Sequence, residues 1–72
     1  MKEKFIEFTN NVFCRRESNQ HKANQLWEEI KHRIPTNEQI LFKTEWNHYV
    51  MGEFDAKLFG LDINKIKKYF EN

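Results

Sequence analysis

The residues whose chemistry would support catalysis or metal binding stand apart from one another in this chain. The three histidines are His21, His32 and His48, and the closest two, eleven residues apart, would lie about 16 Å from each other even on one continuous helix. The single cysteine, Cys14, has no histidine beside it with which to form a zinc site. These spacings predict no metal centre.

The remaining nucleophiles and carboxylates do not form catalytic pairs either. Cys14 follows Phe13 beside the apolar face of an expected helix, which favours a small buried thiol over a nucleophile. Glu28 and Glu29 are adjacent, so on a helix their side chains diverge by about 100° and do not make an acid/base pair. The sequence has no glycine-rich phosphate loop. We therefore expect a protein that is not an enzyme and uses no cofactor or small-molecule substrate.

Polar side chains suited to nucleic acid gather near the C-terminus. On a helix over residues 62–70, Asn64, Lys65, Lys67 and Lys68 fall on the arc opposite the apolar residues. Lysines neutralise phosphates, and an asparagine amide pairs with adenine. A second basic pair, Arg15 and Arg16, would contact phosphates beside this helix. The alternative, which the sequence leaves open, is that the lysines only complement the helix dipole and keep the surface soluble.

Length and composition restrict the protein to one small domain. The chain has 72 residues, a net charge of +1, 39% hydrophobic residues and 15% aromatic residues. This balance is typical of a folded domain and excludes both a nucleic-acid mimic and a strongly basic coating protein. The single cysteine and the lack of a long apolar run predict a cytoplasmic protein without a membrane segment.

The elements that must position these residues are helices. Apolar residues recur at spacings of three and four, which predicts an all-α bundle of four to five short helices. The first is expected over residues 2–16, and the second begins at the capping residues Ser18 and Asn19 and stops at Pro35. Trp27 and Trp46 fall on apolar faces and are expected in the core; if exposed, either would be an anchor for a protein partner.

The third helix is expected from about residue 37 to residue 50. Thr36 and Gln39 have the spacing of a capping box, and Gly52 is suited to end the helix in a left-handed conformation. A β-hairpin is the competing prediction, because residues 40–42 and 46–50 are rich in strand-forming side chains.

Two further short helices are expected over residues 54–59 and 62–70, joined by a turn at Gly60. Ala56 would lie where these helices cross, and their small shared core would be closed by Phe59, Leu61, Ile66 and Tyr69. The run AKLFGLDINKIKKYF resembles the helix-turn-helix DNA-binding family, in particular the C-terminal unit of Fis-type proteins and of tri-helical phage and bacterial regulators. That resemblance implies that the helix over residues 62–70 lies in the major groove of DNA.

The leading hypothesis is therefore a small DNA-binding regulator of phage or bacterial type. Residues 1–35 would form two helices that pack and dimerise, and residues 36–72 a tri-helical helix-turn-helix unit. A homodimer is expected because a single unit with few phosphate contacts would bind double-stranded DNA weakly. The alternative hypothesis is a protein-binding inhibitor or adaptor that acts on a larger host protein, which the near-neutral net charge favours.

Overall fold

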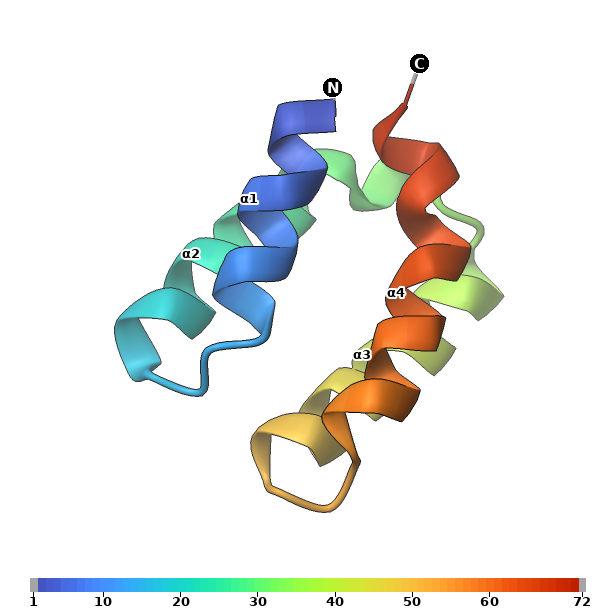
Figure 1. Cartoon of the computed structure of the whole chain (residues 1–72). Helices are drawn as coiled ribbons and strands as arrows, with labels where there is room; N and C mark the ends of the chain where they lie inside the picture. Colours follow the sequence, from blue (N-terminus) through green and yellow to red (C-terminus); the bar gives the residue numbers. More distant parts are fainter. Residues whose placement is uncertain (1, 72) are drawn as a thin grey trace.

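The computed structural model describes residues 2–71 and consists of helices joined by short loops. The elements are α1 (Lys2–Val12), α2 (Glu17–Ile30), a single 3₁₀ turn η1 (Lys31–Arg33), α3 (Thr36–Val50) and α4 (Ala56–Phe70), with no strand in the described residues. Figure 1 shows two helical hairpins, α1–α2 and α3–α4, with both ends of the chain at the same end of the molecule. The all-α prediction is confirmed, and the hairpin alternative for residues 40–50 is wrong.

All four helices contribute to one aromatic core, and Phe8 lies at its centre. The ring of Phe8 is fully buried and lies 5.2–6.3 Å, centroid to centroid, from the rings of Trp27, Phe42, Trp46 and Phe70. Trp27 and Trp46 are 3% and 1% exposed, so both tryptophans are core residues as expected. A chain of this length has few large side chains, and here most of them are concentrated in one cluster.

The helix starts differ from the capping predictions. α2 begins one residue before Ser18, with Arg16 as its extended N-cap residue, while the side chain of Asn19 donates to Asn11 Oδ1 at 2.9 Å. α3 begins at Thr36, with Pro35 as its N-cap and no side-chain cap. The expected capping box does not form, since Gln39 Nε2 instead reaches back to two backbone carbonyls before the helix.

The predicted C-terminal end agrees with the structure for α3 but not for α1 and α2. α1 ends at Val12 rather than near residue 16, and α2 ends at Ile30, where η1 replaces its last expected turn. Gly52 has φ +80° and donates to the carbonyl of Tyr49 at 3.0 Å, which confirms the left-handed end expected for α3.

The expected turn at Gly60 is wrong, because residues 56–70 form one continuous helix. Asp55 caps this helix by accepting a 2.8 Å hydrogen bond from the Lys57 N–H, and the helix passes through both Gly60 and Asp62 without interruption. No separate helix forms over residues 54–59, because residues 56–59 are the first turn of α4, and the expected helix over 62–70 is the C-terminal part of the same helix. The C-terminal half therefore has two helices and lacks the expected tri-helical unit.

Burial explains why the helix continues through a glycine. In one helix Phe59, Ile63, Ile66 and Phe70 have spacings of four, three and four, so all four lie on the buried face. Each contributes about 1.5–3 kcal/mol, whereas a glycine inside a helix costs about 1 kcal/mol. Ile66 is buried as expected and Tyr69 is half-buried, but Ala56 is exposed rather than at a helix crossing, and Leu61 is exposed rather than in a core.

Substitution of Gly60 tests this continuous helix directly. A Cβ at this position would have Phe13 Cζ as its nearest neighbour at 3.8 Å, which is ordinary contact. Gly60→Ala should therefore raise the free energy of unfolding by about 0.5–1 kcal/mol, measured by urea denaturation. The control Gly52→Ala, at φ +80°, should destabilise the protein. Destabilisation by Gly60→Ala would indicate a left-handed turn at residue 60.

Candidate functional site

The four polar residues expected to face DNA lie on the exposed sides of α4. Asn64, Lys65, Lys67 and Lys68 are all exposed, as the periodicity predicts. Lys65 pairs with Asp62 at 3.3 Å, while the ammonium groups of Lys67 and Lys68 lie 5.7 and 5.1 Å from the ring centroids of Phe5 and Tyr69. α4 carries four lysines and one aspartate, in a chain whose net charge is only +1.

The second predicted basic pair does not join this surface. The guanidinium of Arg15 lies 4.3 Å from the centroid of the Tyr49 ring, and its Nε donates to the Tyr49 carbonyl at 3.0 Å. Arg16 is exposed and is the N-cap residue of α2. Because Tyr49 stacks on Phe59 near the start of α4, Arg15 lies about 12 Å along the helix from Lys67.

The histidines and Cys14 are separate in space as well as in sequence. All three histidines are exposed, and His48 Nδ1 lies 3.0 Å from a carboxylate oxygen of Glu53. Cys14 lies in the loop after α1 and is partly exposed, so it is not the buried thiol expected. Within residues 2–71 no three side chains of the metal-binding types form a cluster.

A groove with acidic sides separates α3 from α4. It is lined by Glu38, Leu41, Phe42, Glu45, Asp62, Lys65 and Ile66. Tyr69 donates to Glu38 Oε2 at 2.6 Å, and this hydrogen bond, with burial and the carboxylate charge, raises the pKa of Tyr69. The groove thus brings three carboxyl groups next to an apolar floor.

Glu45 has the most perturbed acid–base equilibrium in this groove. Desolvation by the surrounding residues, a hydrogen bond to Asp62 and the charge of Asp62 together raise the pKa of Glu45 to about 7, against the opposing effect of Lys65. The side chain of Asp62 is only 15% exposed, whereas that of Lys65 is 78% exposed. The ammonium of Lys65 therefore lies mostly in solvent, where it offsets the effect of Asp62 on Glu45 only in part.

Exposed apolar side chains are concentrated on the second hairpin. In the described chain the exposed large hydrophobic residues are Ile6, Ile40, Leu41, Val50, Met51, Leu58 and Leu61. Only Ile6 lies outside α3, its C-cap residue and α4. Leu41 lines the groove, and Leu58 stands four residues before Asp62, on the same side of α4. We call Leu41, Leu58 and Leu61 the leucine patch.

No protein-family model, curated protein or solved structure matches this chain. The interpretation of its surfaces therefore rests on their own chemistry. None of the described helices is long and apolar enough to cross a membrane.

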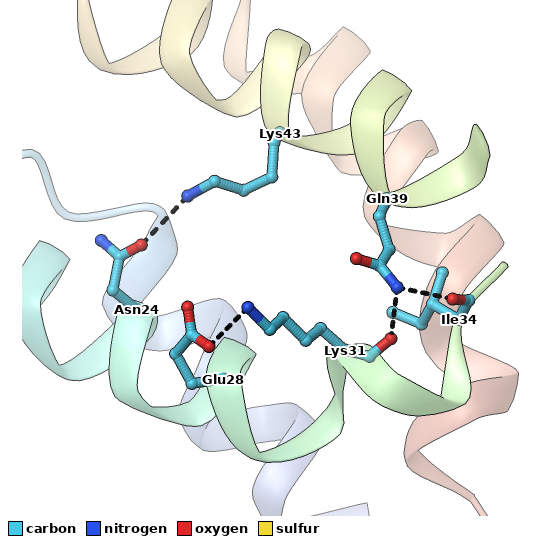
Figure 2. A network of polar contacts seen from close by, with 6 residues as sticks. All are labelled: Asn24, Glu28, Lys31, Ile34, Gln39 and Lys43. Atoms are coloured by element: carbon cyan, nitrogen blue, oxygen red, sulfur yellow. Dashed lines mark hydrogen bonds and ion pairs between the residues drawn. The ribbon is translucent and has the colours of Figure 1, made fainter. Parts of the chain in front are cut away.

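The other side of α3 is joined to α2 and η1 by polar contacts, shown in Figure 2. Lys43 Nζ donates to Asn24 Oδ1 at 3.0 Å and lies 4.1 Å from the centroid of the Trp46 ring. Burial of the ammonium lowers the pKa of Lys43, with Lys31 adding to this effect and Glu28 opposing it. Gln39 Nε2 donates to the carbonyls of Lys31 and Ile34, both at 2.7 Å. These contacts hold the two hairpins together.

Sequence reasoning located the lysine face but missed the groove and the leucine patch. Glu38 and Glu45 lie two turns apart on one face of α3, but Asp62 comes from α4, and only the antiparallel approach of the two helices brings it beside them. The helix-turn-helix interpretation places Leu61 in a core, whereas it is 60% exposed. The helical period would have predicted its exposure. Leu61 is two residues from both Phe59 and Ile63, which places it on the opposite side of the helix from these buried residues.

The raised pKa of Glu45 gives a pH-dependent contribution to stability. The folded protein binds this proton more tightly than the unfolded chain does, so the contribution is full at low pH and is lost as the pH rises through about 7. Between pH 5 and pH 8, wild type should therefore lose stability relative to Glu45→Gln, as measured by urea midpoints. The control Glu29→Gln, on α2, should track wild type. Equal changes in wild type and Glu45→Gln would contradict the assignment.

Proposed function

We propose that this protein is a non-catalytic protein-binding module, an adaptor or inhibitor, that docks through the leucine patch and the α3–α4 groove. The observation that carries this proposal is that three leucines, each 52–64% exposed, stand at this groove: Leu41 lines it, and Leu58 and Leu61 lie within about one turn of Asp62 on α4. Apolar side chains scattered singly over a surface are ordinary, whereas neighbouring ones indicate an interaction site. The tryptophans play no part in it, since both are buried.

The residues that line the groove beside the leucine patch indicate which side chains a partner would need. Glu38, Glu45 and Asp62 line the groove with Lys65 as its single cation. A partner with an apolar side chain for the leucines and a lysine or arginine for the groove would complement both features. The carboxylates set the specificity, and the leucines supply most of the buried apolar area.

Site-specific photocrosslinking tests this docking surface. A benzophenone amino acid at position 61, in lysate of the cells that produce the protein, should give one defined protein adduct that persists at 0.5 M salt. The matched control carries the crosslinker at position 6, where Ile6 is 49% exposed on α1, and should not give that adduct. With the captured protein purified, Leu58→Asp should weaken binding at least 10-fold, or about 1.4 kcal/mol. Identical adducts from both positions, or none, would refute the proposal.

A second candidate function is DNA binding through the lysine face of α4. The specific observation in its favour is that Lys65, Lys68 and Asn64 are exposed on the most basic helix of the chain. Two features count against it: the helix-turn-helix turn is absent from α4, and Asp62 and Glu45 border the same helix with negative charge.

Gel-shift titration decides whether the lysine face binds DNA. If it does, Lys68→Ala should weaken binding to all sequences and flatten its salt dependence. Asn64→Ala should cost about 1–3 kcal/mol on the preferred sequence alone. No shift at low salt, where non-specific contacts are strongest, would exclude this function and leave the protein-binding proposal in place.

A further inference from the structure

α3 is apolar on two opposite sides, and the fold covers only one of them. Phe42, Trp46 and Tyr49 face the core and are 1–4% exposed. On the opposite side, Ile40 is 62% exposed and Met51, the C-cap residue, is 65% exposed. Two exposed apolar side chains in one line of a helix, with only the uncharged Thr44 and Asn47 between them, match the composition of an interface better than that of a solvated face. The uncovered side of α3 therefore has the character of an interface.

The exposed residues on this side form a regular stripe. Ile40, Thr44, Asn47 and Met51 are all exposed and follow one another at spacings of four, three and four. These spacings place the four side chains along one line of the helix, as in the seam between two paired helices. We call them the outer stripe of α3. It contains no charged residue.

The outer stripe is complementary to a second copy of itself that runs in the opposite direction. Its spacings are the same from either end, so a second α3 running antiparallel brings Ile40 opposite Met51 of the second copy and Thr44 opposite Asn47 of the second copy. Apolar side chains then meet apolar ones, and a hydroxyl meets an amide with which it can hydrogen-bond. A two-fold axis requires each contact to occur twice, and this pattern satisfies that requirement.

The surface beside the stripe has room for the second copy's side chains. Two shallow hollows lie between α2 and α3, and Lys43, seen in Figure 2, borders both. Besides Lys43, one hollow is lined by Asn47, Val50 and Met51 with the amide side chains of α2, and the other by Ile40, Thr44 and Asn47 with Glu28 and Lys31 on its far side. In the antiparallel arrangement, Ile40 of the second copy enters the first hollow and Met51 of the second copy enters the second.

We propose that the protein forms a two-fold symmetric homodimer in which the outer stripes of two α3 helices pack antiparallel. An uncharged, palindromic stripe fits a second copy better than it fits a charged partner. This interface replaces the expected dimer through residues 1–35 with one on the second hairpin. It does not use the leucine patch, so it is independent of the proposed function.

A pair of charge substitutions tests the antiparallel contact by sedimentation equilibrium. Wild type should be in monomer–dimer equilibrium, and Ile40→Glu or Met51→Lys alone should each weaken dimerisation at least 10-fold, because each places charges against apolar side chains twice. Mixed in equal amounts, the two variants should form a heterodimer with nearly wild-type affinity. In that heterodimer one contact becomes a Glu–Lys pair and the other stays apolar.

Two controls separate the interface from effects on folding. Leu58→Glu, at a residue that is 52% exposed on α4, should dimerise like wild type. Circular dichroism should show unchanged helix content in both stripe variants, since both residues are exposed. The proposal is overturned if wild type stays monomeric up to about 1 mM, if the single variants dimerise like wild type, or if mixing does not restore association.

Discussion

The ring of Phe8 is the contact on which the rest of the structure depends. It comes from α1 and touches one ring of α2, two of α3 and one of α4, so every helix is positioned against it. A chain of 72 residues cannot bury a second core, and loss of a central phenylalanine side chain typically costs about 3–5 kcal/mol. The surfaces of α3 and α4 are thus displayed by a scaffold whose order depends on a single aromatic cluster.

Polar side chains fix how the hairpins meet around that cluster. Gln20 Nε2 donates to the carbonyls of Val12 and Cys14 at 2.9 and 2.8 Å, and Gln20 Oε1 accepts from Trp46 Nε1 at 2.7 Å. Gln20 therefore satisfies the carbonyls at the end of α1 and holds α3 in place at the same time. Such partly buried hydrogen bonds add specificity to aromatic contacts, which alone would tolerate several arrangements.

The helices were predicted correctly where the spacing of apolar residues was the only signal. They were predicted less well where a local signal, such as a glycine or a capping residue, conflicted with burial. The apolar faces around Phe8, Trp27 and Trp46 followed directly from spacings of three and four. The turn predicted at Gly60 is wrong because the local preference of glycine is the weaker effect. Burial of Phe59, Ile63, Ile66 and Phe70 on one face stabilises a continuous helix by more free energy than the glycine costs. The predicted capping box does not form for a related reason: Gln39 donates instead to the backbone carbonyls of Lys31 and Ile34, just before α3. The lysine face of α4 was predictable from the helical period, but the groove was not, because it requires the register between α3 and α4.

The raised pKa of Glu45 means that the proposed docking of a cationic side chain in the groove would depend on pH. With a pKa of about 7, Glu45 changes its protonation state near neutral pH. A cationic side chain entering the groove stabilises the carboxylate and expels that proton. Complex formation would then release a fraction of a proton per molecule, become tighter as the medium becomes more alkaline, and show a calorimetric heat that varies with the ionisation enthalpy of the buffer.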